Sequence, residues 1–153
     1  MKDLDRLDRR ILRLLQEDGR LSNAELAERI ALSPTATAER VKRLTREGYL
    51  IGYMALISPE KLGLNLLVFV EVKLDRTTAD VFETFAAAVR NSAAVMECHM
   101  VAGGFDYLVK ARVAGMEAYR QFLSEVILPL PGVRETHTYA VMEEIKSASL
   151  LPI

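Results

Sequence analysis

The chemistry that this sequence could perform is concentrated near residue 40, where basic and small polar side chains follow one another closely. Guanidinium and ammonium groups bind phosphate oxygens, and short hydroxyl side chains can approach the edges of nucleic-acid bases. An ordinary solvated helix face would have a similar composition, so the residue types alone leave both interpretations open. The polar residues are Ser33, Thr35 and Thr37, with Pro34 between the first two, and the basic residues are Arg40, Lys42, Arg43 and Arg46.

Other reactive residue types do not form a recognisable catalytic or metal-binding set. Cys98 and His99 are neighbours in the sequence, and side chains of adjacent strand residues point to opposite faces of a sheet. The same argument separates Glu143 from Glu144. Two histidines and one cysteine lack the spacing of a metal site. The sequence also lacks a nucleophile motif, a phosphate-binding loop and a dinucleotide fingerprint. We therefore expect no enzymatic activity, no metal and no cofactor.

The composition indicates a cytoplasmic protein with one medium domain or two small ones. The chain has 153 residues, and 50% of them are hydrophobic. No apolar run reaches the ~18 residues that a membrane span needs, and the charged start does not resemble a signal peptide. Residues 1–50 carry 11 basic and 9 acidic side chains, whereas the rest carries 9 and 12. This asymmetry weakly favours nucleic-acid binding by the first third of the chain.

The elements that would position the basic residues are three short helices. Apolar residues at Leu7, Ile11, Leu14 and Leu15 form one helical stripe, which we expect to end at Gly19 in a left-handed conformation. A capping box at Ser22 begins the second helix. Ser33 and Pro34 begin the third, whose inner face holds Val41 and Leu44 with Ala38 or Thr37, and Gly48 ends it. The short connection before Ser33 is typical of a helix-turn-helix.

The remainder predicts a second domain with alternating strands and helices in the order βαββαβ, the ferredoxin-like arrangement. Helices on one face of such a sheet leave the other face uncovered. We expect the apolar alternation of the first strand of this domain to require cover from a second copy of the chain. A strand at Tyr49–Ile57 and a linker at Pro59–Asn65 precede the domain. The expected elements are strands at Leu66–Leu74, Ala94–Ala102, Phe105–Val113 and Arg134–Ile145, and helices at Thr78–Val89 and Met116–Leu128.

Several stretches together resemble the leucine-responsive regulatory protein/AsnC family of transcriptional regulators. The resemblance extends over nearly the whole chain and implies an α+β protein: a winged-type helix-turn-helix in residues 1–60, then a ferredoxin-like ligand-responsive RAM domain in residues 61–153. It also implies double-stranded DNA and a small amino acid as partners, and dimers that join into octamers. The matching stretches are LDRLDRRILRLLQEDGRLSNAELAERIALSPT, ERVKRL, LLVFVEVKL, ECHMVAGGFDYLVKARV, AYRQFL, LPGVRETHTY and VMEEIK.

The resemblance also implies site residues. The helix-turn-helix corresponds to Asn23–Lys42, with the recognition helix beginning at Ser33. The chain departs from the usual family pattern at Ala36-Thr37, at Ala102-Gly103-Gly104 and at Ala140, so the operator sequence and the effector stay open. The effector positions are Gly103, Gly104, Asp106, Met116, Tyr139, Ala140 and Val141.

The effector positions have suitable chemistry for a free amino acid. Asp106 could pair with its ammonium group, and backbone N–H groups around Gly103 and Gly104 could receive its carboxylate. Met116 could adapt to an aliphatic side chain such as that of leucine. Alternatively, Asp106 and the glycines only form a hairpin turn.

We therefore expect a sequence-specific, nucleoid-associated transcriptional regulator in the cytoplasm. Two alternatives stay open. The protein could be an architectural DNA-compacting protein of low specificity, or the second domain could act as a small enzyme or stand-alone amino-acid-binding module.

Overall fold

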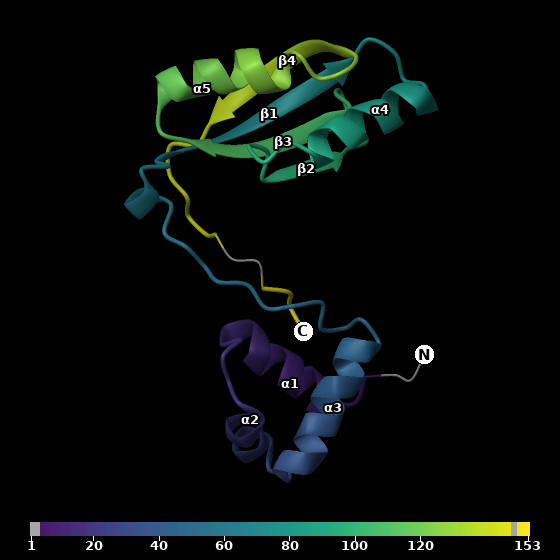
Figure 1. Ribbon diagram of the computed structural model, residues 1–153, viewed down its shortest axis with the longest axis vertical. Coiled ribbons are helices and arrows are strands. Elements are labelled where there is room, and N and C mark those ends of the chain that lie inside the picture. The colour runs from purple at the N-terminus through teal and green to yellow at the C-terminus, as the bar shows by residue number, and fades with distance from the viewer. Residues whose placement is uncertain (1–3, 148–149) are drawn as a thin grey trace. The chain divides into compact units, whose positions relative to one another are not determined.

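The computed structural model describes residues 4–147 and 150–153, which form two compact units (Figure 1). The first unit contains residues 4–56 and the described residues from 146 onward, and the second contains residues 57–145. The C-terminal residues belong to the first unit because Arg13 Nε donates to the carbonyl of Ile153 at 2.8 Å, and Ile153 packs against the first core. Our expected division assigned these residues to the second domain. Within the described residues, no helix is long and apolar enough to span a bilayer.

Three helices form the first unit, as the sequence predicts: α1 (Arg6–Glu17), α2 (Asn23–Ile30) and α3 (Pro34–Arg46). Ser22 and Glu25 form the expected capping box, and the Ser33 side chain caps α3 by accepting from the Ala36 amide. Apolar stripes from the three helices meet in one core, which buries Ile11, Leu26 and Leu44 almost completely.

The turn chemistry differs from our expectation at two positions. Gly19 was predicted to be a left-handed cap, but the cap of α1 is Asp18 in an extended conformation, and Gly19 is not among the residues with positive φ. The left-handed residue is instead Ala31, between α2 and α3, with φ 57° and ψ 48°. Gly48, after α3, does have a positive φ of 78°. The tight turn of the helix-turn-helix therefore places an alanine in a conformation that favours glycine.

The predicted strand at Tyr49–Ile57 is wrong: residues 51–57 lie in irregular extended chain. A strand is stable only when another strand satisfies its backbone groups, and none within the described residues pairs with this segment. Its apolar side chains are exposed, with Ile51, Met54 and Leu56 at 90% or more.

The second unit confirms the βαββαβ order. Its elements are β1 (Leu66–Leu74), α4 (Ala79–Arg90), β2 (Glu97–Met100), β3 (Tyr107–Val113), α5 (Met116–Phe122) and β4 (Val133–Ala140). A 3₁₀ turn (Glu60–Leu62) precedes β1, and a π-helical turn (Leu123–Ile127) extends α5. The antiparallel sheet has the order β2-β3-β1-β4. β2 begins later and ends earlier than predicted, and β4 ends earlier, since each strand extends only as far as its pairing with the neighbouring strand.

The helices α4 and α5 cover one face of this sheet. Phe85 of α4 stacks on Tyr107 of β3 at 4.3 Å between ring centroids, and the hydroxyl of Tyr119 on α5 hydrogen-bonds to Thr138 of β4. The alternating apolar residues of β1 face these helices and are buried. Our expectation that a second copy must cover this alternation was therefore wrong. The residues concerned are Val68, Val70, Val72 and Leu74.

The opposite face of the sheet is mixed rather than apolar. Phe69 lies there with Glu71, and the Tyr139 hydroxyl donates to Glu71 at 3.0 Å. Lys110 and Glu97 form an ion pair of 2.8 Å on the same face.

The left-handed alanine generates a stability prediction. We expect Ala31→Gly to stabilise the first unit by about 0.5–1 kcal/mol, because glycine adopts positive φ without the steric cost of Cβ. Ala87→Gly, at an exposed position inside α4, is the matched control and should destabilise the protein by a similar amount. Urea unfolding followed by circular dichroism measures both. Destabilisation by Ala31→Gly would contradict this explanation of the turn.

Candidate nucleic-acid interface and effector site

The exposed face of α3 contains only part of the predicted DNA-binding set. Thr35, Lys42 and Arg46 are exposed to solvent. Thr37 is fully buried, and its hydroxyl donates to the Ser33 carbonyl at 3.0 Å. Thr37 therefore belongs to the three-helix core, which corrects our expectation that it approaches bases.

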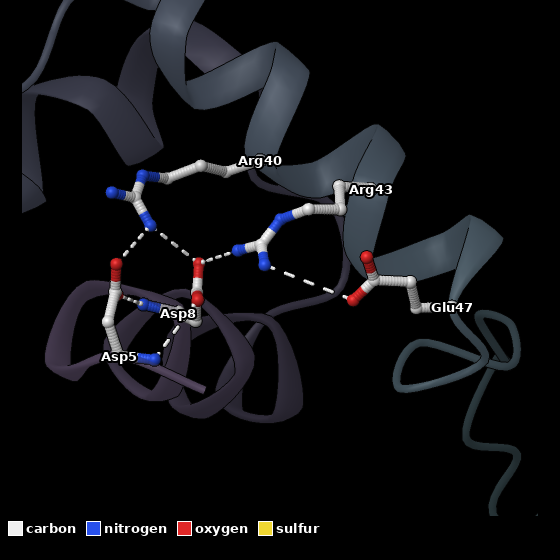
Figure 2. A network of polar contacts seen from close by, with 5 residues as sticks. All are labelled: Asp5, Asp8, Arg40, Arg43 and Glu47. Atoms are coloured by element: carbon white, nitrogen blue, oxygen red, sulfur yellow. Dashed lines mark hydrogen bonds and ion pairs between the residues drawn. The ribbon is translucent and has the colours of Figure 1, made fainter. Parts of the chain in front are cut away.

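Arg40 and Arg43 point back toward the N-terminus of α1, where they meet Asp8 (Figure 2). One carboxylate oxygen of Asp8 lies 2.7 Å from Arg40 and 2.6 Å from Arg43. Arg40 also contacts Asp5 at 2.7 Å, and Arg43 lies 3.9 Å from Glu47. Asp5 and Asp8 in turn bond to each other's backbone amides. We call Asp5, Asp8, Arg40 and Arg43 the α1–α3 clamp.

The Asp8 carboxylate is the buried centre of the clamp, since only 1% of its surface is exposed. Burial acts to raise its pKa, but the hydrogen bonds from Arg43 and Arg40, with that from the Asp5 amide, outweigh burial and lower the pKa below its ordinary value. Both arginines keep the aspartate ionised and fix the position of α3 against α1. Their charge is therefore partly neutralised within the protein.

Sequence reasoning missed the clamp because it assigned Asp5 and Asp8 to the helix dipole and every arginine of α3 to DNA. A signal was present: two acids three residues apart begin one helix, and two arginines three residues apart lie on another. Long-range pairing between them depends on the packing angle of α1 and α3, which spacing does not provide.

The two other predicted contacts at helix starts are Asn23 and Pro34. Asn23 is the first residue of α2 and is exposed, and Pro34 is the first residue of α3. Ser33 is exposed as well, although its hydroxyl already serves as the cap. Small exposed groups and two exposed cations therefore remain on the side of α3 that points away from the core.

The expected effector residues fall into two groups at opposite ends of the sheet. Gly103, Gly104 and Asp106 lie in the β2–β3 connection, at the end of the sheet that holds the C-terminal part of β1. Asp106 is held there by three bonds: its amide donates to Val72, its carbonyl accepts from Val101, and its carboxylate accepts from the Leu74 amide at 2.7 Å. We call this group the hairpin half-site.

The second group lies where β1 begins. Ala140 pairs with Val68, the Val141 amide donates to the Leu67 carbonyl at 2.9 Å, and Met116 starts α5 shortly after β3 ends. Tyr139 is adjacent, and both Met116 and Tyr139 are at least half exposed. We call Met116, Tyr139, Ala140 and Val141 the helix half-site. Val68 and Leu74 are separated by about 20 Å of strand, so the two half-sites of one chain cannot contact the same amino acid.

This arrangement joins a three-helix DNA-binding unit to a ferredoxin-like ligand-binding unit, which defines a ligand-responsive DNA-binding regulator. Residues 4–51 match the winged helix-turn-helix DNA-binding family model, and residues 67–151 match the Lrp/AsnC ligand-binding domain model. The chain is 56% identical to the leucine-responsive regulatory protein of Salmonella typhimurium over 99% of its length and 93% of that protein.

Two solved structures agree in fold with this chain. A transcriptional regulator of Neisseria meningitidis in complex with L-Met is 41% identical, with a TM-score of 0.93 over 98% of this chain and 97% of that one. An AsnC family regulator of Agrobacterium tumefaciens is 32% identical, with a TM-score of 0.92 over 97% of each chain. The chain belongs to the Lrp/AsnC family and is a DNA-binding transcriptional regulator with an amino-acid-binding domain.

The clamp leads to a prediction on stability and pH. Asp8→Ala should destabilise the first unit by about 2–3 kcal/mol, less than the ~3–5 kcal/mol of a fully buried pair because both arginines are partly exposed. The pKa of Asp8 is lowered in the folded protein, so its contribution is present above the unfolded pKa of about 4 and is lost as the pH falls through the lower folded value.

The measurement is urea unfolding between pH 2.5 and 7 for the parent and for Asp8→Asn. The parent should lose stability at the acidic end, and the variant should show a smaller loss there. Equal pH dependence in the two proteins would contradict the role of Asp8.

Proposed function

We propose that α3 lies in the major groove of double-stranded DNA and reads bases with its N-terminal residues. Ser33, Pro34 and Thr35 form this end of the helix, and their small size permits close approach to base edges. Lys42 and Arg46 bind phosphates on either side, and Asn23 at the start of α2 contacts the backbone. The observation that supports this assignment is that these side chains are exposed while the neighbouring arginines are engaged with Asp8.

Arg40 and Arg43 contribute to the interface mainly by holding α3 in position, rather than by binding phosphate themselves. The clamp orients α3 before binding, so the helix loses little freedom when it enters the groove. N–H groups of the two guanidinium groups that the clamp leaves open can still contact phosphate, since these side chains are 28% and 19% exposed.

The effector is a small aliphatic amino acid, with leucine as the first candidate. The Salmonella relative is named for its response to leucine, and the Neisseria regulator is complexed with L-Met, which is also apolar and unbranched at Cβ. In this chain, the ammonium group pairs with the Asp106 oxygen that does not hold the Leu74 amide, and amides near Gly103 and Gly104 receive the carboxylate. Met116 of the helix half-site contacts the side chain.

One amino acid meets both half-sites only where two copies of the chain come together. The distance between the half-sites supports a site formed by two copies. The hairpin half-site of one copy would complete it together with the helix half-site of the other. Ligand binding then favours one arrangement of copies over others, and assembly changes DNA affinity in turn. Dimers that join into octamers provide such contacts, and paired DNA-binding units favour near-palindromic operators. We place the protein in the cytoplasm, associated with the nucleoid.

An architectural role with low sequence specificity is the second candidate. The two exposed cations and the small polar residues of α3 would also support binding to many sequences. Selection of bound genomic fragments separates the two, since a specific regulator enriches a shared sequence and an architectural protein does not.

The proposed phosphate contacts can be tested by the salt dependence of binding. Lys42→Gln and Arg46→Gln should each weaken binding to a selected genomic fragment and lower the slope of log K against log salt by about 1. Arg76→Gln, an exposed position in the second unit, is the control and should change neither quantity. Normal affinity and slope in both α3 variants would reject this placement of the helix.

The effector assignment is tested most cleanly by Asp106→Asn. Asparagine keeps an oxygen for the Leu74 amide but removes the charge that pairs with an ammonium group. We expect the variant to fold and bind DNA as the parent does and to lose the response to leucine. Because coupling between sites is typically about 1–3 kcal/mol, the parent should change DNA affinity by about 5–150-fold.

The readouts are operator affinity and particle mass, measured against each common amino acid. A parent that responds to none of them at millimolar concentration contradicts the sensor function. A variant that responds like the parent excludes Asp106 from the site.

A further inference from the structure

A cavity of about 270 Å³ lies between α4 and the β2–β3 edge of the sheet. It contains none of the residues assigned to the effector half-sites. Its walls are largely apolar, with one hydroxyl, one thiol and one guanidinium group. The lining residues are Ala86, Val89, Arg90, Cys98, Met100 and Tyr107.

The Tyr107 hydroxyl is the unusual group in this cavity. Tyr107 is 4% exposed, and its oxygen has no hydrogen-bond partner among residues 4–147 and 150–153. Phe85 stacks on the ring, and Phe82 meets it edge-on with centroids 6.0 Å apart, so the ring is held in place. A buried hydroxyl without a partner is costly, and an acceptor that enters the cavity would remove this cost.

Arg90 supplies a positive charge at the same cavity. It is exposed, ends α4 and, within the described part of the chain, forms no ion pair. Its full charge exceeds the partial negative charge of about −0.5 at a helix C-terminus. Burial raises the pKa of the Cys98 thiol, so at neutral pH this residue is a neutral wall of the cavity rather than a competing anion.

We propose that this cavity binds a small monocarboxylate with an apolar tail. The tail packs between Ala86, Val89 and Met100, and the carboxylate accepts from Tyr107 and pairs with Arg90. The cavity is partly open to solvent, and its volume of about 270 Å³ leaves room for a short apolar chain that ends in a carboxylate. An amino acid fits less well, because its ammonium group would meet no carboxylate among the lining residues. The ligand class therefore differs from that of the amino-acid effector.

Octanoate, which has the predicted size and charge, is the probe, and the full-length protein is used throughout. Equilibrium dialysis should show saturable binding to the parent. Tyr107→Phe should weaken it about 2–10-fold, as expected for one lost hydrogen bond. The same variant should raise the Tm of the ligand-free protein, because it removes the unpaired hydroxyl. A purely structural role would not combine higher stability with lower affinity.

Arg90→Gln separates the charge from the apolar contribution. It should weaken octanoate binding and leave 1-octanol binding unchanged, whereas Arg76→Gln, the matched control, should alter neither. Cys98 is the only cysteine of the chain, so its alkylation rate by iodoacetamide reports occupancy of the cavity, and octanoate should slow it. Absence of saturable binding to the parent overturns the proposal. Unchanged octanoate affinity in both Tyr107→Phe and Arg90→Gln also overturns it.

Discussion

The pairing of β1 with β3 and β4 is the constraint on which the ligand-binding unit depends. Antiparallel pairing along nearly the whole strand fixes the hairpin half-site at one end of the sheet and the helix half-site at the other. The side chains of β1 that face inward pack against α4 and α5. The strand therefore cannot shift its register without exposing them to solvent. Under the proposed function, a ligand that needs both half-sites requires two copies, so ligand binding and assembly form one coupled equilibrium.

The DNA-binding unit depends in a similar way on a single buried group. Asp8 neutralises part of the charge of Arg40 and Arg43, and the same ion pairs fix the position of α3 against α1. If α3 enters DNA as we propose, it offers a fixed surface with few free cations rather than a strongly basic one. A regulator with modest electrostatic attraction relies more on base contacts, which favours selection among sequences over uniform coating of DNA.

The sequence was sufficient to predict the regular elements. It was insufficient where a contact with a distant part of the chain determines the conformation or burial of a residue. Apolar periodicity and caps predicted α1, α2 and α3, and alternation predicted β1, because these patterns are local. The segment after Gly48 also has strand composition, yet it has no pairing partner in the described residues, and composition cannot provide one. Thr37 was assigned to both the core and the interface, and only packing shows that it is buried.

The effector positions illustrate the same limit. The resemblance indicated which residues to consider, but their separation follows from strand register, which no single motif encodes. The cavity beside Tyr107 was also missed, since Arg90, Cys98 and Tyr107 come from three different elements and meet only through the packing of α4 on β2 and β3.

The central claim, that two copies complete each effector site, is tested most directly by mixing two variants. Asp106→Asn disables the hairpin half-site, and Met116→Glu, at an exposed position, disables the helix half-site. The two proteins are mixed, allowed to exchange subunits, and titrated with leucine while operator affinity is followed. If each site takes one half from each of two chains, random assortment restores about one site in four, although neither variant responds alone. A mixture that stays as unresponsive as its components would show that both halves act within a single chain.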